Sequence, residues 1–412
     1  MTDGAGGAPA LASPTDEAPA PGPDAGAGSP ASPVAPGIAP VEVKRVGNRI
    51  DRWRFVDLPF RIFGRDPEWV PPLRVSVHDR ISPKHPANAH QETALWIAYR
   101  RGRPVARIGA CVDRLFNEFQ GLSWAWIGFF ESFDDPDAAA ALFDTVWRWA
   151  RARGATTCVG PASFTTNDEC GLLVQGFEHP PLILTPHNPP YYERLWVDGG
   201  WEQTMDLWGW RFERASTALS ERQRRVLDRL KARSGLSVRG MRMDDFDAEV
   251  HRFFQVYNSA WSRNWGFAPM TEEEIRHLAK GLRQVIDPDA ALVVETGEGE
   301  PLAVCLALPD VNQALRGVRS GRLLPLGWWR LMRGARRPSR ARGFALGVAA
   351  EHQQRAVGPL LYAEIVDRMR AKPNIEWAEA SWILATNTRM NSALAAMGAV
   401  RYKTWRLYER RL

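Results

Sequence analysis

The residues from Gly347 to Gly358 are those whose types and spacing best suit chemistry, because they could hold a phosphate group. A short apolar stretch ends at Val348, a polar loop follows, and a helix is expected to open at Pro359. The backbone N–H groups at a helix start have no partner within the helix and carry partial positive charge. The sequence therefore predicts an anion-binding loop here.

Length and composition limit what can position such a loop. The chain of 412 residues exceeds the usual size of one core, which favours two domains. A hydrophobic fraction of 45% with 24% charged residues is typical of a globular protein. We find no apolar run of about 18 residues, which argues against a membrane span.

The cysteines and histidines do not indicate a metal site. His179 and His187 have neither the spacing nor the cysteine partners of one, so no metal is predicted. The cysteines lie far apart, without a CxxC pair, and are expected to be buried free thiols in a reducing cytoplasm. They are Cys111, Cys158, Cys170 and Cys305.

Residues 1–40 consist almost entirely of Ala, Pro, Gly and Ser with a few acids. Such a composition has too little apolar surface to offset chain entropy, so it predicts a disordered tail. The tail lacks the basic start and the continuous apolar core of a signal peptide, so we expect a cytoplasmic location.

Two stretches of the chain show the same order of motifs. Gly102–Ala106 and Gly299–Ala303 each join two strand-like runs, as in a hairpin. Asn188 and Asn387 each open a helical pattern, and the two spacings from hairpin to asparagine are nearly equal. Equal spacings between independent matches indicate an internal repeat.

A strand, a helix and a second strand are expected between these markers in both halves. In the first half Asp135 can cap the helix, with Pro136 in its first position. In the second half Pro359 opens the helix, and a buried stripe is expected on one face. The residues of this stripe are Leu361, Ile365 and Met369.

These patterns predict an α/β fold of the α+β kind, with a mixed sheet and helices on both faces. The predicted organisation is a tail at 1–40, a first domain at 41–213, a linker helix at 214–235 and a second domain at 236–412. The linker is expected to be helical and is polar around most of its circumference.

In this order of elements the chain resembles a tandem pair of GNAT acyltransferase domains, over roughly residues 45–412. Such enzymes typically show a valine ending the fourth strand, then Gln/Arg-x-x-Gly-x-Gly/Ala opening a helix that holds the pyrophosphate of acyl-coenzyme A. The first glycine of this pattern is Ala356 here, which is tolerable where φ is negative. The resemblance implies binding of acetyl-coenzyme A or another acyl-coenzyme A. The residues it implies are Val348, Gln353, Gln354, Arg355, Ala356, Val357, Gly358 and Asn387.

The resemblance also implies acyl transfer to an amine, which needs a proton acceptor and N–H groups for a developing oxyanion. Val348 matches the oxyanion position, and Glu351, Glu379 and Asp310 are candidate bases, each alternatively a solvated charge. Leu394 stands where the family commonly has the tyrosine that protonates the departing thiolate. The candidate substitutes are Tyr362, Tyr402 and Tyr408, although an aromatic residue on a strand more often packs in a core.

The first half departs further from the family pattern. Acidic residues, among them Glu131, Asp134 and Asp135, stand where a phosphate would need positive potential. We therefore predict a degenerate copy that supports the second half or shapes a substrate cleft. The candidate acceptor-binding residues are Asn188, Tyr191, Asn264, Trp265 and Asn312.

A basic run extends from Arg316 to Arg342, with nine arginines, no acid, and interleaved leucines and tryptophans. It could contact RNA, an anionic membrane surface or the phosphates of coenzyme A. The alternative is an arginine-rich composition without a specific partner.

The function predicted from these observations is an acyl-coenzyme A dependent N-acyltransferase. Acetyl transfer to a small-molecule or peptide amine is expected, with the cofactor on the second domain and the acceptor between the domains. Two alternatives stay open: a Fem-type aminoacyl transferase that uses charged tRNA, and a non-catalytic binding protein that kept the fold without the acid at Leu394. Nothing in the sequence indicates an oligomeric state.

Overall fold

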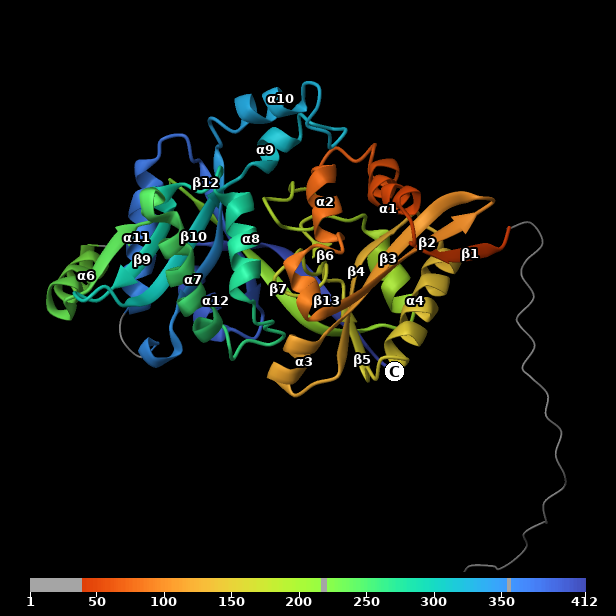
Figure 1. Cartoon of the computed structure of the whole chain (residues 1–412). Helices are drawn as coiled ribbons and strands as arrows, with labels where there is room; N and C mark the ends of the chain where they lie inside the picture. Colours follow the sequence, from red (N-terminus) through yellow and green to blue (C-terminus); the bar gives the residue numbers. More distant parts are fainter. Residues whose placement is uncertain (1–38, 216–220, 354–356) are drawn as a thin grey trace, which may run out of the picture. The chain divides into compact units, whose positions relative to one another are not determined.

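The computed structural model describes residues 39–215, 221–353 and 357–412, and Pro40–Leu412 forms one compact unit (Figure 1). The predicted tail lies almost wholly outside the described residues, as do three predicted cofactor ligands, Gln354, Arg355 and Ala356. Among the helices of the described part, none combines the length and apolarity needed to cross a bilayer.

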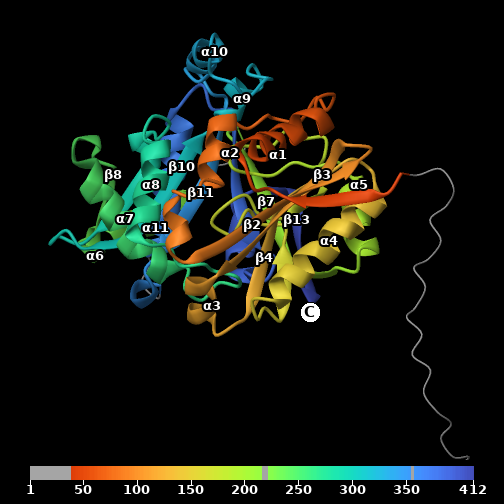
Figure 2. The ribbon, with the colours of Figure 1, turned by 45° about the vertical axis from the view of Figure 1, so that its right-hand side comes forward.

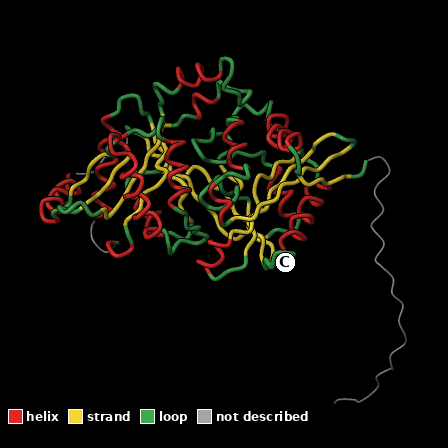
Figure 3. Tube along the Cα trace, viewed as in Figure 1, coloured by secondary structure: helices red, strands yellow, loops and turns green. Residues whose placement is uncertain are grey.

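The described residues form one mixed sheet of thirteen strands, shown in yellow in Figure 3. The strand order is β1-β2-β3-β4-β5-β13-β7-β12-β11-β10-β9-β8, and β6 pairs with β13. The strands are β1 Val41–Arg45, β2 Gln91–Arg100, β3 Arg103–Asp113, β4 Trp124–Ser132, β5 Thr157–Gly160, β6 Leu172–Gln175, β7 Glu202–Glu213, β8 Ser237–Gly240, β9 Ala291–Glu295, β10 Pro301–Pro309, β11 Arg340–Val348, β12 Trp377–Leu384 and β13 Val400–Arg411.

Helices cover both faces of this sheet, as predicted (Figures 1 and 2). They are α1 Arg49–Ile62, α2 Arg74–Arg80, α3 Arg114–Gln120, α4 Pro136–Arg151, α5 Tyr191–Asp198, α6 Glu221–Ser234, α7 Phe246–Ala260, α8 Glu272–Leu282, α9 Asn312–Leu315, α10 Gly327–Gly334, α11 Val357–Ala371 and α12 Thr388–Ala396.

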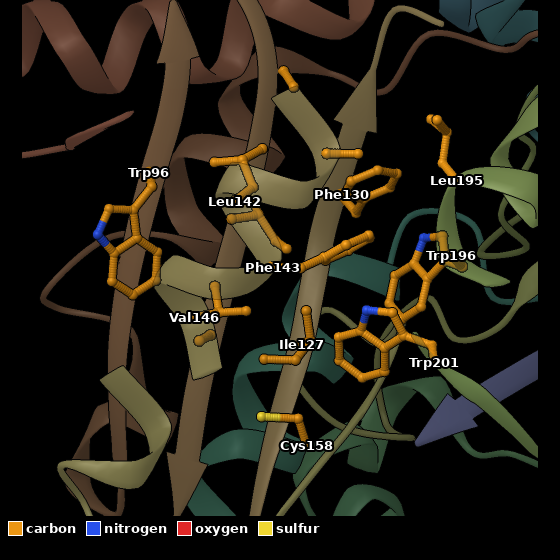
Figure 4. Close-up of a cluster of buried hydrophobic side chains, with 14 of the residues drawn as sticks. Trp96, Ile127, Phe130, Leu142, Phe143, Val146, Cys158, Leu195, Trp196 and Trp201 are labelled. Atoms are coloured by element: carbon orange, nitrogen blue, oxygen red, sulfur yellow. The ribbon is translucent and has the colours of Figure 1, made fainter. Parts of the chain in front are cut away.

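Successive side chains of a strand point to opposite faces of the sheet, and in the first half this shows which helix covers which face. Ala106 and Ile108 of β3 belong to the buried cluster that contains Leu142 of α4 (Figure 4). Arg107, between them, points to the other face and donates a hydrogen bond of 2.7 Å to the carbonyl oxygen of Phe55 in α1. Helices α4 and α1 therefore lie on opposite faces.

The second half is built in the same way. Leu292 of β9 packs in a cluster with Leu361 of α11, whereas its neighbour Val293 packs with Val256 of α7. Both halves also contain the predicted hairpins, β2 with β3 and β9 with β10. The repeat seen in the sequence is therefore present as a repeated arrangement of strands and helices.

Two pairs of neighbouring strands run parallel in the described sheet, β4 with β5 and β11 with β12. A parallel connection needs a crossover, and α4 and α11 supply the two crossovers. The predicted start of the second crossover at Pro359 is two residues late, since α11 begins at Val357.

The last strands of the two halves are exchanged. Strand β7 ends the first half but pairs with β12 of the second, and β13 ends the chain but pairs with β5 of the first. Strands β7 and β13 also pair with each other, which makes the sheet continuous. The boundaries at 41–213 and 236–412 stay a prediction, and neither range contains all the partners of its own strands.

A histidine also joins the halves. The ring of His90 lies 2.9 Å from Asp113 Oδ1 through Nδ1 and 3.0 Å from Glu274 Oε2 through Nε2. Burial alone would lower the pKa of His90, but the hydrogen bonds to the two carboxylates raise it to about 9. The charged imidazole therefore links β3 to α8.

Candidate active site

A gap opens between β11 and β12. Their parallel pairing runs from Arg340 opposite Trp377 to Gly343 opposite Ala380, whereas β11 continues to Val348. Beyond Gly343 the facing edges of the two strands share no ladder pair. Backbone groups on these edges are therefore available to a ligand that enters between the strands.

Two backbone N–H groups point toward this gap. The N–H of Ala349 donates to Leu302 of β10, on the side away from β12. Because successive N–H groups of a strand point to opposite edges, those of Val348 and Leu346 point toward the gap. They can stabilise negative charge on an oxygen placed there, which is the role predicted for Val348.

A groove of about 690 Å³ lies at this open end, between α11 and α12. Leu346–Val348 line it from the strand, Gly358 from the start of α11, and Asn387 from the start of α12. A Cβ added to Gly358 would meet Val348 Cγ2 at 3.8 Å, so its backbone has ordinary clearance. A helix start at one end of such a groove suits an anionic group.

Two arginines line the same groove and were not predicted as ligands. Arg389 lies in the first turn of α12, and Arg222 lies in α6, which we expected only to link the domains. Arg224 of α6 pairs with Asp367 of α11 at 2.8 Å, which holds the linker helix beside the groove. The position of Arg389, two residues after Asn387, was the available sequence signal.

An apolar cavity of about 200 Å³ continues from the groove. Tyr362 and Asn387 line both spaces. The cavity extends under α11 along Ile365 and Met369, which are partly exposed to it. Of the predicted buried stripe, Leu361 is fully buried and Ile365 is partly buried against the same cluster, whereas Met369 is partly exposed and lies outside that cluster.

Glu379 lies at the wall of this cavity and is 1% exposed. Its carboxylate accepts short hydrogen bonds from the hydroxyl groups of Ser381 and Tyr402. The sequence proposed Glu379 and Tyr402 separately, and the structure brings them into contact. Ser381 and Arg342 complete the cluster and were not predicted as site residues.

Arg342 neutralises this carboxylate. Its guanidinium is fully buried, with Nε 3.9 Å from Glu379 Oε1 and 2.9 Å from Ser381 Oγ. It also donates to the carbonyl oxygens of Ile183 and Leu184, at 2.7 and 3.0 Å. Burial lowers the pKa of Arg342 to about 10, although Glu379 opposes the shift, so the side chain stays charged at neutral pH.

The arginine therefore corrects one expectation about the basic run. Arg342 is not part of a solvated surface, because it stands in parallel register with Glu379 inside the sheet. Arg316 at the other end of the run donates to the carbonyl oxygen of Pro67 at 2.7 Å and is only partly exposed. The accessible part of the run lies between these residues.

Two further buried charges surround the cluster. Burial lowers the pKa of Lys403 to about 8, and its Nζ donates to the carbonyl oxygen of Pro180 at 2.8 Å. Burial raises the pKa of Asp310 to about 7, while Oδ1 accepts N–H bonds from Ile183 and Asn312. Asp310 does not line the groove or the cavity, unlike Glu379.

The candidate tyrosines are separated in space. Tyr362 lies where the groove meets the cavity, and its hydroxyl is 2.5 Å from Met390 Sδ on α12. Tyr402 contacts Glu379, and burial raises its pKa far above the usual value. Tyr408 donates to Glu193 at 3.2 Å in the buried cluster around α4, away from both spaces. Leu394 is 2% exposed, as expected of a core residue.

The loop residues split into two groups. Gln353 faces the site and donates to the carbonyl oxygens of Val348 and Ala260, at 3.3 and 3.4 Å. Glu351 is exposed and accepts from Ser259 at 3.3 Å, and it lines neither the groove nor the cavity. The structure thus does not bring Glu351 together with Glu379.

The predicted acceptor residues are dispersed. Asn264 lines the groove and the cavity, whereas Trp265 packs against Trp124, with ring centroids 5.7 Å apart. The others bond to the main chain: Asn188 to Leu173, Tyr191 to Ser132 and Asn312 to Pro181. Of the five, only Asn264 has a place beside these two spaces.

The corresponding loop of the first half is filled by its own charges. Asp135 caps α4 by accepting from the N–H of Ala138 at 3.1 Å, and it pairs with Arg100 at 2.7 Å. Burial alone would raise the pKa of Asp135, but the bonds from Arg100 and Ala138 lower it. A phosphate would meet a carboxylate at this helix start, in agreement with a degenerate copy.

Two known proteins are similar to this chain over nearly its whole length, whereas no family model matches it. Protein YghO of Escherichia coli (strain K12) is 32% identical over 372 residues, which cover 89% of this chain and 94% of that protein. A bacterial ceramide synthase of Caulobacter vibrioides (strain NA1000 / CB15N) is 36% identical over 392 residues, covering 92% of this chain and 97% of the synthase.

Solved structures show the same architecture. A tandem GNAT protein from the clavulanic acid biosynthesis pathway aligns with a TM-score of 0.54 at 15% identity, covering 90% of this chain and 98% of that one. A GCN5-related glucosamine N-acetyltransferase region of a fungal enzyme aligns with a TM-score of 0.54 at 11% identity, covering 91% of this chain and 38% of that one. The predicted tandem GNAT fold is confirmed.

Proposed function

The chain belongs to the family that includes YghO and the bacterial ceramide synthase, and from this premise we propose that it transfers a long acyl group from coenzyme A to a lipid amine. It is an N-acyltransferase-like enzyme of the GNAT fold. The acyl length and the acceptor are the new parts of this proposal, and they replace the expected transfer of acetyl to a small-molecule or peptide amine.

One observation carries the proposal: an apolar cavity continues the groove at the start of α11, with a buried carboxylate at the wall of the cavity. The groove suits coenzyme A, because the start of α11, Arg222 and Arg389 supply positive potential along it. The cavity under α11 suits an alkyl chain, because burial of each CH₂ group is favourable by about 0.8 kcal/mol. An acetyl group would leave this cavity largely unused.

The side chains around the gap have separate roles in this proposal. The bound thioester supplies the acyl group, and the N–H groups of Leu346 and Val348 hold its carbonyl oxygen as negative charge develops. Glu379 accepts the proton of the attacking amine, directly or through Ser381. Arg342 positions the carboxylate through Ser381 and the ion pair at 3.9 Å.

Tyr362 is assigned to the leaving sulfur. It stands at the junction of the groove and the cavity, where the thioester must lie if the alkyl chain occupies the cavity. Burial raises the pKa of Tyr362 above its usual value, so its hydroxyl stays protonated and stabilises the thiolate by donating a hydrogen bond. Tyr402 is less suited, because it lines neither the groove nor the cavity and its hydroxyl donates to Glu379, whereas the hydroxyl of Tyr362 would exchange its contact with Met390 for the sulfur of the thioester.

The test is a transfer assay on the full chain. Acyl-coenzyme A of increasing acyl chain length is combined with a long-chain amino alcohol. Release of the coenzyme A thiol is measured with a colorimetric thiol reagent, and the amide product is identified by mass spectrometry. We expect kcat/KM to rise with acyl length. Glu379→Gln should lose about 100-fold or more in kcat, because a positioned base contributes that much. The matched control is Glu376→Gln, an exposed carboxylate on the approach to the same strand.

Four results would contradict the proposal. Absence of heat on titration with any acyl-coenzyme A would exclude the assigned groove. Equal transfer rates for acetyl and long acyl groups would show that the apolar cavity does not bind the acyl chain. Transfer that depends on aminoacyl-tRNA and is abolished by ribonuclease would favour the Fem-type alternative, and binding without turnover would favour a non-catalytic protein.

A further inference from the structure

An apolar face is exposed on α10 and on the residues just before it. The exposed fractions are 76% for Leu324, 59% for Leu326, 52% for Trp328, 49% for Trp329 and 54% for Met332. Trp328 and Met332 are four residues apart in the helix, and Trp329 and Met332 are three apart, so they share one side. Large apolar side chains gathered in this way mark an interaction site more often than chance exposure does.

The helix is held to the protein by its small residues. A Cβ added to Gly334 would lie 2.8 Å from the Cβ of Ala314 in α9, and one added to Gly327 would lie 2.0 Å from the carbonyl oxygen of Arg322. The glycines therefore face the protein and the tryptophans face outward, the reverse of an ordinary amphipathic helix on a soluble protein. In Figures 1 and 2, α10 lies beyond α9, away from the sheet.

Exposed positive charge surrounds this face. Arg322, Arg330, Arg333, Arg336 and Arg337 are all exposed. The sequence from Val311 to Ala350 contains no acidic residue to offset them. The guanidinium of Arg333 lies 5.4 Å from the ring of Trp329, so charge and apolar surface are interleaved.

We infer that this face, α10 with residues 322–326 and 335–337, binds the surface of an anionic lipid bilayer. Tryptophan, leucine and methionine can enter the region between headgroups and acyl chains, while the arginines contact lipid phosphates. Such a helix lies in the plane of the membrane and needs no spanning segment. The inference concerns binding alone and does not depend on the proposed transfer reaction.

The chemistry favours a bilayer over RNA. RNA would use the arginines and could stack on the tryptophans, but it offers no apolar surface for Leu324, Leu326 and Met332. A second copy of the chain would have to bring the same positive charge to the same face, where like charges repel. A bilayer with anionic lipids complements both the charge and the apolar surface.

A cavity lies between this face and the apolar cavity beside Glu379. Its volume is about 650 Å³, and Ala335, Arg336 and Pro338 line it at the end that follows α10. Ala341 and Met369 line both this cavity and the apolar cavity beside Glu379. A bilayer bound at α10 would therefore lie next to a wall shared with the proposed acyl site.

The test is flotation of the full chain with vesicles in a density gradient, without acyl-coenzyme A. We expect the protein to float with vesicles that contain phosphatidylglycerol and to float poorly with phosphatidylcholine alone. Replacing Trp328, Trp329 and Met332 by Ser should abolish flotation. Arg330→Gln with Arg333→Gln should weaken binding to anionic vesicles roughly tenfold or more, and high salt should have a similar effect.

The matched control is Trp53→Ser with Ile50→Ser, two residues of α1 that are 47% and 64% exposed. Circular dichroism and thermal melts of all variants report whether each is folded. The inference would be overturned if the variant with Ser at 328, 329 and 332 floated as well as the wild-type protein. It would also be overturned if the wild-type protein did not float with anionic vesicles. Loss of a dimer in light scattering, with vesicle binding unchanged, would instead assign the face to a second copy.

Discussion

Replacing Arg342 by Met tests whether this residue supports Glu379. The guanidinium is fully buried and makes four hydrogen bonds of 2.7 to 3.2 Å, to Ser381 and to the carbonyl oxygens of Ile183 and Leu184. Methionine has a similar length and fills the space without charge. The substitution therefore leaves a buried carboxylate whose remaining partners are the hydroxyl groups of Ser381 and Tyr402.

The magnitude follows from the cost of an unpaired buried charge. Removing one member of a buried ion pair typically lowers the free energy of unfolding by about 3–5 kcal/mol. In the double variant Arg342→Met with Glu379→Gln both charges are absent, and the remaining cost is that of the unpaired carbonyl and hydroxyl groups, about 1–3 kcal/mol. The double variant should therefore be more stable than Arg342→Met alone, by about 2 kcal/mol.

The assay is urea unfolding followed by tryptophan fluorescence, at one pH, for both single variants and the double variant. Arg340→Met serves as the control, since Arg340 is on the same strand and only partly buried. Transfer activity is measured in parallel, and Arg342→Met should lose activity even where the protein remains folded. Additive effects of the two substitutions on stability would refute the reasoning, because they would show that Arg342 and Glu379 do not interact.

Three further substitutions test other parts of the structure. Gly347→Ala would place a Cβ 2.4 Å from Cη2 of Trp261. We expect it to lower the free energy of unfolding in urea by about 1–3 kcal/mol and to raise KM. Gly281→Ala is the control, because a Cβ there would have nothing within 4 Å. Ile365→Trp should fill the apolar cavity and lower kcat/KM for long acyl groups at least about tenfold, with little change for acetyl; equal losses would contradict the assigned cavity. The pKa of His90 in the folded chain, about 9, exceeds its usual 6.5, so its stabilising effect is present below pH 6.5 and declines as pH rises to 9. His90→Gln should make the free energy of unfolding nearly independent of pH over that range. An unchanged pH dependence would show that the ion pairs of His90 do not stabilise the protein.

The sequence was sufficient for the two hairpins, the two crossover helices and the helix that Asn387 opens. Hairpins, capped helices and the repeat depend on local patterns, so Asp135 and Asn387 cap their helices as predicted. The resemblance to GNAT domains then placed Val348 at the edge of the gap. Leu394, which stands where the family commonly has a tyrosine, is 2% exposed and packs in a core cluster with Trp210.

The cluster around Glu379 could not be assembled in the same way. In the sequence, Arg342 cannot be distinguished from the other arginines of the basic run. Only the parallel register of β11 with β12 brings it opposite Glu379. Tyr402 reaches the same carboxylate from β13, a strand whose partners are fixed by the exchange between halves. Register and exchange are long-range properties, so no local pattern in the sequence reports them.

The exchange also explains how the first half can contribute to the candidate site although a carboxylate stands at the start of its own helix α4. Strand β7 of that half pairs along β12 and supplies Phe212 to the wall of the apolar cavity. The carbonyl oxygens of Ile183 and Leu184, also from the first half, hold Arg342 against Glu379. The first half thus contributes a wall and two acceptors to a site whose other groups come from the second.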